Sequence, residues 1–169
     1  MRRREVSETT DQDLHGLSPC VCSTLRMVTR AVTQLYDDVL RPSGLRVTQF
    51  SLLATLARLG EANLTRLTES LAIDQTTLTR SLALLERAGL IERVPHPDAR
   101  IKAMRLTATG RRALKVARPL WTRAQDRVLR EVGTKTWADT KRRLAHLLDA
   151  TVERRGSGRR PGRAGRTSH

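Results

Sequence analysis

The segment Thr76–Gly110, TTLTRSLALLERAGLIERVPHPDARIKAMRLTATG, decides the fold because it places two short strands directly behind a helix. Its first half has leucines at helical spacing, at Leu78, Leu82 and Leu85. The stretches LIERV and IKAMRL then have the composition and alternation of strands. Pro95 and Pro97 between them disfavour helix. The segment therefore predicts a helix that ends near Gly89 and is followed by a β-hairpin.

The residues before this segment predict a second short helix. Asn63 is expected to cap it, and Asp74 to cap the helix that follows. Two short helices joined by a turn of a few residues form a candidate helix-turn-helix. A further helix is expected upstream, ending at Gly60, with four apolar side chains inward: Phe50, Leu53, Leu56 and Leu59.

A long amphipathic helix is predicted near the N-terminus, with Ser18 as its cap and Pro19 at its first position. It runs to Arg41-Pro42, and apolar residues recur along it at alternating steps of four and three: Val21, Leu25, Val28, Val32, Leu35 and Val39. This stripe is too long for a small neighbour to cover. We therefore expect a helical partner, supplied by a second subunit.

Two more helices are predicted after the hairpin. The first is capped by Thr107 or Thr109, should be kinked by Pro119 and ends at Gly133. Its inward residues are expected to be Leu114, Ala117, Trp121, Ala124 and Val128. The last helix covers about 135–154, with apolar residues at Trp137, Leu144, Leu147, Leu148 and Val152. The fold class is therefore mainly α with a small antiparallel β wing.

The predicted organisation is a single domain between two disordered ends. Residues 1–17 and the basic tail 154–169 are expected to be disordered, because both are polar and aperiodic. Within 18–153, the helices at about 18–41 and 108–153 flank a winged helix-turn-helix at about 46–107.

The composition favours a polyanionic partner. The net charge is +15 and the isoelectric point about 11.5. The tail alone holds six arginines that account for +6, namely Arg154, Arg155, Arg159, Arg160, Arg163 and Arg166. The remaining +9 still favours nucleic acid, although charge alone does not separate DNA from RNA or a membrane surface. No apolar run approaches the roughly 20 residues of a membrane span, and no signal peptide is evident, so a cytoplasmic protein is expected.

The helix within Thr76–Gly110 has an exposed arc suited to DNA. At about 100° per residue its leucines lie on one side, and the opposite arc carries Thr76, Thr79, Arg80, Ala83 and Arg87. Threonine offers a hydroxyl and a methyl group, and arginine forms bidentate pairs with guanine. The alternative is an ordinary solvated face. Such a face usually carries Glu and Lys, whereas no acid occurs between Gln75 and Leu85, which favours binding.

The hairpin tip places Asp98 and Arg100 next to each other in Asp-Ala-Arg. On a narrow ribbon behind a DNA-reading helix, Arg100 would reach the minor groove, with Asp98 as its support. The alternative is an ordinary turn, since Asp, Pro and Arg are common at hairpin tips.

GLRVTQFSLLATL and TTLTRSLALLERAGLIERVPHPDARIKAMRLTATG, together with the flanking helices, resemble a MarR-type transcriptional regulator. The resemblance covers about Ser18 to Val152. It implies a winged-helix homodimer, dimerised through its first and last two helices, that binds double-stranded operator DNA of pseudo-palindromic sequence. Thr77, Thr79 and Arg80 match the DNA-reading motif, and Asp98 and Arg100 match the wing. Arg46 departs from the family, which often has a capping Ser or Thr there.

Cys20 and Cys22 are the chain's two cysteines. With Ser18 as cap they fall at N2 and N4, where a helix N-terminus favours a reactive thiolate. Residues two apart on a helix point about 200° apart, which argues against a mutual disulfide or a shared metal. A thiol sensor of oxidants, electrophiles or soft metals is the alternative function. The simpler interpretation is that both are small apolar residues at an interface.

Other site types find no support in the sequence. The four histidines are scattered, and no phosphate-binding loop, HExxH or nucleophile constellation is present, so no enzyme, metal or cofactor is expected. The interpretation that results is a dimeric repressor released by an unknown small-molecule effector. Its rivals are a non-specific architectural DNA-binding protein and, least favoured, an enzyme using the two thiols.

Overall fold

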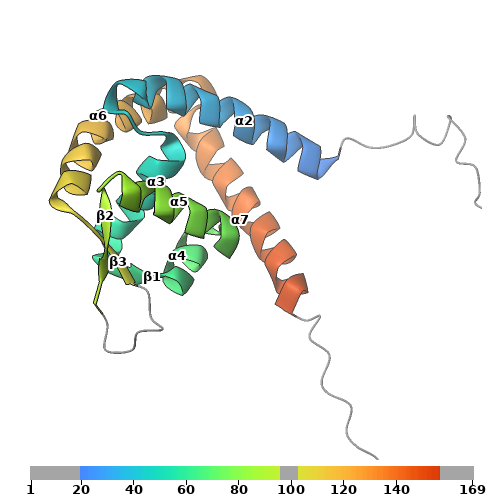
Figure 1. Ribbon diagram of the computed structural model, residues 1–169. Coiled ribbons are helices and arrows are strands. Elements are labelled where there is room, and N and C mark those ends of the chain that lie inside the picture. Colours follow the sequence, from blue (N-terminus) through green and yellow to red (C-terminus); the bar gives the residue numbers. More distant parts are fainter. Residues whose placement is uncertain (1–19, 96–102, 157–169) are drawn as a thin grey trace, which may run out of the picture. The chain divides into compact units, whose positions relative to one another are not determined.

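The computed structural model describes residues 20–95 and 103–156, with side chains as far as Thr151. The chain divides into two compact units, residues 1–124 and 125–169, and each is described by itself. Figure 1 shows the helices and strands. The elements are α2 (Val21–Leu40), η1 (Arg41–Ser43), α3 (Val47–Leu59), β1 (Glu61–Asn63), α4 (Leu64–Leu71), α5 (Gln75–Arg87), β2 (Ile91–Val94), β3 (Ala103–Leu106), α6 (Ala108–Val132) and α7 (Thr134–Gly156). The mainly helical fold with a small antiparallel sheet is confirmed.

The sheet has three antiparallel strands in the order β1-β3-β2. The two predicted strands pair as a hairpin, with Ile91 opposite Leu106 and Val94 opposite Ala103. The third strand, β1, was not predicted, because three residues with Ala62 as the single apolar one carry no recognisable alternation. It pairs with the other edge of β3, so that β3 becomes the central strand.

The core of the first unit contains Phe50, Leu53 and Leu56 of α3, Leu67 of α4, and Leu78, Leu82 and Leu85 of α5, whereas Leu59, Leu64 and Leu71 are only partly buried. Leu52 and Thr55 of α3 are also buried. Eight large side chains are essentially inaccessible: Leu40, Leu52, Leu53, Leu56, Leu67, Leu78, Leu85 and Ile91. Phe50 stacks on Trp121 with ring centroids 5.6 Å apart, so that α6 is fixed to α3 within this unit.

The predicted helix ends are confirmed around α4 and α5. Asn63 Oδ1 accepts a hydrogen bond from Arg66 N–H at 2.9 Å, and Asp74 Oδ1 accepts one from Thr77 N–H at 2.9 Å. Gly89, at φ +66°, closes α5 with two bonds of a Schellman motif. Its own N–H donates to the carbonyl of Glu86, and the next N–H donates to that of Leu85.

Thr107, not Thr109, caps α6. Its Oγ1 accepts from Gly110 N–H at 3.0 Å and donates to the Gly89 carbonyl at 2.7 Å, so one hydroxyl joins the start of α6 to the end of α5. The helix continues through Pro119 as a single element and ends before Gly133, at φ +83°.

The N-terminus of α2 differs from the prediction. The helix begins at Val21 with Cys20 as its N-cap, two residues later than a Ser18 cap would place it. Ser18 and Pro19 lie outside the described residues. All side chains from Val21 to Val32 are exposed in the isolated chain, including most of the predicted apolar stripe.

The second unit contains α7, whose side chains are mostly exposed. Three of its apolar residues, Trp137, Leu144 and Leu148, are 37 to 48% exposed, and Leu147 is half-buried. No helix in the described part of the chain is long and apolar enough to cross a bilayer.

Candidate nucleic-acid interface

Helix α5 presents the five residues predicted on it to solvent. Its buried side is made by Leu78, Leu82 and Leu85, which hold it against the core. Every candidate DNA-contacting side chain of the helix is exposed, namely Thr76, Thr77, Thr79, Arg80 and Arg87. The structure therefore brings these residues together on one accessible face.

The side chains on this face differ in whether their polar groups are already hydrogen-bonded within the protein. Thr79 Oγ1 donates to the carbonyl of Gln75 at 2.7 Å, which leaves its methyl group and an acceptor lone pair for a ligand. Arg87 Nε donates to the carbonyl of Ala83 at 3.3 Å, so its guanidinium is tied to its own helix. Arg80 makes no hydrogen bond or ion pair with any described residue. Its five N–H donors are available to an external acceptor.

The acids at the two ends of α5 are engaged. Asp74 caps the helix, and hydrogen bonds from the side chain and backbone of Thr77 lower the pKa of its carboxyl. Glu86 forms a fork with Arg93 of β2, at 2.9 Å from Nε and 3.3 Å from Nη2. A phosphate approaching the middle of the helix therefore meets no unpaired carboxylate there, and the helix N-terminus adds a favourable dipole.

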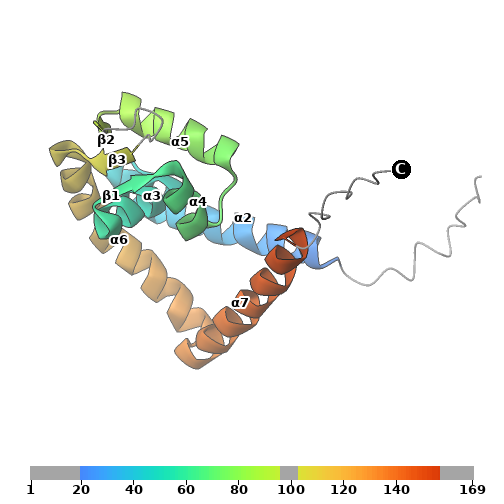
Figure 2. The same ribbon diagram turned by 90° about the horizontal axis from the view of Figure 1, so that it is seen from below.

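The base of the hairpin is held by ion pairs that the sequence did not reveal. Arg105 of β3 lies opposite both Glu92 and Glu61 in the sheet register. Its Nε is 2.8 Å from Glu92, its Nη1 is 3.5 Å from Glu61, and these partners, Glu92 foremost, raise its pKa. Figures 1 and 2 show β2 next to the C-terminal end of α5, where Arg93 meets Glu86.

These pairs were missed for an identifiable reason. The alternation Glu92-Arg93 and the lone Arg105 are visible in the sequence, but the partners of Arg105 follow from strand register, and Glu61 becomes a partner only once β1 is known. The partner of Arg93 depends on how α5 packs beside β2. Asp98, Arg100 and the rest of the hairpin tip lie outside the described residues, so their proposed contacts stay predictions.

Both cysteines are exposed. Cys20 is the N-cap, with extended backbone, and Cys22 is at N2, so each lies two helix positions earlier than a Ser18 cap would place it. Within the described residues, no group of three or more histidine, cysteine or acidic side chains is arranged to hold a metal ion.

Comparisons with known proteins agree with this geometry. A family model described as the MarR family matches residues 45–102. The transcriptional regulator MosR of M. tuberculosis, solved in complex with DNA, is 40% identical, with 81% of this chain and 99% of that chain covered at a TM-score of 0.75. A second MosR structure is 37% identical, covering 80% and 98%, at 0.70.

A mutant MarR from E. coli complexed with operator DNA shares the fold at 23% identity and a TM-score of 0.69, covering 76% of this chain and 93% of that one. Comparison with curated proteins finds no match.

Proposed function

Because this chain belongs to the MarR family of DNA-binding transcriptional regulators, we propose that it is a homodimeric repressor that binds a pseudo-palindromic operator and is released by a small-molecule effector. The observation that carries the proposal is the exposed face of α5, which is free of acids and rigidly backed by three buried leucines. Such a face fits the major groove of double-stranded DNA. The proposed site of action is the cytoplasm, on chromosomal DNA.

The proposed contacts divide by chemistry. Arg80, which has no partner among the described residues, would form a bidentate pair with a guanine edge. Thr76, Thr77 and Thr79 would contact base edges and the thymine methyl group, and Arg87 a phosphate. From the sequence, Arg100 would enter the minor groove, with Asp98 holding it in place.

The proposed dimer rests on unmatched apolar surface. Val21, Leu25, Val28 and Val32 are 37 to 60% exposed along α2, although their spacing is that of a helix-packing seam. A second copy would cover them, and a two-fold axis would place two recognition helices on half-sites about one helical turn apart.

Release by an effector would act through that spacing. A ligand that binds one arrangement of the two recognition helices better than another shifts the population toward it.

The test begins with footprinting on the intergenic DNA beside the gene, followed by titration of the protected duplex. Arg80→Ala should weaken binding about 10- to 100-fold and relax base preference at one position of each half-site. Arg100→Ala should weaken binding with the fold unchanged.

Arg142→Ala on α7 removes the same charge from a residue that pairs with Asp139, and is the matched control. Unchanged titrations for both Arg80→Ala and Arg100→Ala would refute the docking. Equal affinity for random DNA and for the footprinted site would instead favour the architectural alternative.

A thiol-sensing regulator is the second candidate, favoured by the exposure of both cysteines at the start of α2. Structures of E. coli MarR have been determined in an oxidised and a reduced form. Oxidation at Cys20 or Cys22 would then alter the proposed dimer. If a Cys20→Ser, Cys22→Ser double variant releases operator DNA in oxidant or soft metal as readily as the parent, the thiols are not the sensor.

A further inference from the structure

The first turn of α3 has no acceptor of its own at the N-cap. Arg46 occupies that position, and a guanidinium has donors but no acceptor. The Arg46 N–H itself donates to Gln49 Oε1 at 2.9 Å, so the backbone at position 46 is satisfied from within the helix. The N–H of Val47, the first helical residue, still needs an acceptor, because the first turn of a helix leaves its donors unpaired.

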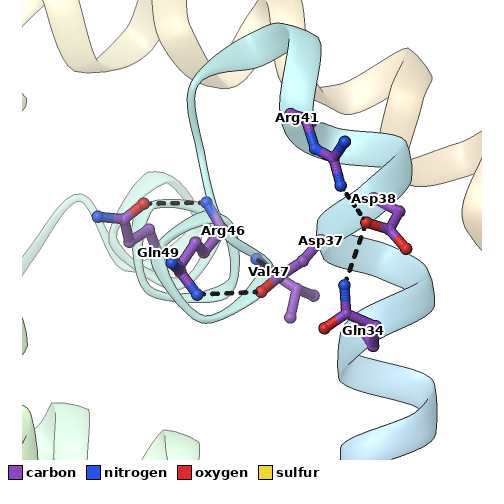
Figure 3. A network of polar contacts seen from close by, with 7 residues as sticks. All are labelled: Gln34, Asp37, Asp38, Arg41, Arg46, Val47 and Gln49. Atoms are coloured by element: carbon purple, nitrogen blue, oxygen red, sulfur yellow. Dashed lines mark hydrogen bonds and ion pairs between the residues drawn. The ribbon is translucent and has the colours of Figure 1, made fainter.

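That acceptor comes from α2. Asp37 Oδ1 accepts the Val47 N–H at 2.7 Å, and Asp37 Oδ2 lies 3.7 Å from Arg46 Nη1 (Figure 3). The Asp37 side chain is 19% exposed, whereas that of Arg46 is 78% exposed. The carboxylate is therefore set into the junction between the helices, and its short charge-assisted bond to the backbone is the directional part of the contact.

The neighbouring Asp38 has the same chemistry but different partners. It accepts a hydrogen bond from Gln34 at 3.1 Å and pairs with Arg41, both close to it in sequence. Its carboxylate thus stays with α2 and η1, while that of Asp37 crosses to α3 (Figure 3).

The junction matters because of what each helix carries. α2 bears the exposed apolar side chains proposed for dimerisation, and α3 packs in the core that also holds α5. The apolar contacts around Leu40 and Leu45 are non-directional. A hydrogen bond from a fixed backbone N–H restricts the angle and the slide between the two helices.

We propose that Asp37 is a positioning residue for operator recognition, which holds α3 at a fixed angle to α2 and so sets the separation of the two recognition helices. This inference rests on the proposed dimeric operator binding. Asp37 takes over the capping role that Arg46 cannot perform, and in doing so it joins the dimerisation helix to the DNA-binding segment.

The experiment measures how the full-length protein discriminates between operators of different half-site spacing. Duplexes selected from a random-sequence library supply the preferred operator, and two derivatives carry one base pair more or less between half-sites. The parent should prefer the selected spacing by about 10-fold or more. Asp37→Ala should reduce this preference to within about 3-fold, with non-specific binding retained, and Asp37→Asn, which keeps the acceptor, should lie between.

Asp38→Asn is the matched control and should keep the full spacing preference. Adding Arg46→Ser to Asp37→Ala supplies a local cap, and should restore thermal stability without restoring the spacing preference. If Arg46→Ser restores both, or if Asp37→Ala and Asp37→Asn keep the parental preference, the positioning role is wrong. If the parent itself shows no preference between spacings, the proposed operator binding fails instead.

Discussion

Gly110 lies in the first turn of α6, directly over the turn that closes α5. A Cβ at this position would lie 1.9 Å from the carbonyl oxygen of Leu90, which is backbone and cannot rotate away. The same carbonyl accepts the Thr107 N–H at 3.1 Å, so a shift would also disturb the start of α6. Gly110 is therefore required by a close approach of two chain segments, and not by its φ angle.

Gly110→Ala should consequently lower the free energy of unfolding by about 2–4 kcal/mol, measured by denaturant titration. Gly89→Ala is the control in the same turn. Its Cβ would meet nothing within 4 Å, but φ is +66°, so a cost of only about 1 kcal/mol is expected. Equal costs for the two substitutions would contradict the steric explanation.

Single residues also show which features could be predicted from the sequence and which could not. The exposed threonines and Arg80 were predicted from helical periodicity, because a regular helix fixes which side chains share a face. The partner of Arg46 was not predictable. Asp37 is nine positions earlier, and its approach depends on how the chain turns at η1.

At the scale of the element, the cap of α5 makes its stability depend on pH. The pKa of Asp74 is lowered below 3.8, its ordinary value, by hydrogen bonds from Thr77. A lowered folded-state pKa means that the stabilisation is fully present above the ordinary value and is lost as the pH falls through the folded value.

Asp74→Ala should therefore lower the melting temperature by about 3 °C at neutral pH. The melting-temperature difference from the parent should narrow as the pH falls below 3.8 and through the lowered pKa of Asp74 in the folded protein, because the parent carboxyl then becomes protonated. Thermal denaturation followed by circular dichroism at several pH values measures both effects. A gap that stays constant down to pH 2 would show that the charge of Asp74 is not involved.

Elements differed in how well the sequence predicted them. The N-termini of α4 and α5 were predicted correctly, because the side chains of Asn63 and Asp74 accept hydrogen bonds from N–H groups only three residues away. β1 was missed, since a three-residue strand is defined by its partner β3 and not by its own pattern. The start of α2 was placed two residues too early, because Ser18-Pro19 has the composition of a helix start although the helix begins at Val21.

At the scale of the whole molecule, the proposed dimer predicts that α2 tolerates no charge on its apolar stripe. Val28, which is 51% exposed in the single chain, would be buried by a second copy. Val28→Asp should raise the dimer dissociation constant at least about 100-fold, because an unpaired carboxylate would be desolvated. Sedimentation equilibrium measures the change.

Arg30→Asp places a carboxylate on the opposite side of the same helix and should leave the dimer intact. A Val28→Asp protein that remains as dimeric as the parent would show that α2 does not form the interface.

The arginine-rich end predicts a salt-dependent contribution to DNA binding. Removal of residues 154–169 deletes six positive charges. Each phosphate contact that is lost should reduce the slope of log K against log salt by about 0.9. Operator titrations at several salt concentrations compare the truncated and full chains, and the preference for operator over random DNA should stay the same. An unaltered slope would show that this segment does not contact DNA.

The sequence by itself determined the helices, the hairpin and the exposed face of α5, because periodicity, capping residues and prolines act within a few positions of the chain. Only the tertiary structure decided the third strand, the Arg105 and Arg93 ion pairs, the need for Gly110 and the link from Asp37 to α3. Each of these joins residues that are distant in sequence or belong to separate elements. Their distances and angles follow from strand register and helix packing, which depend on the folded chain as a whole.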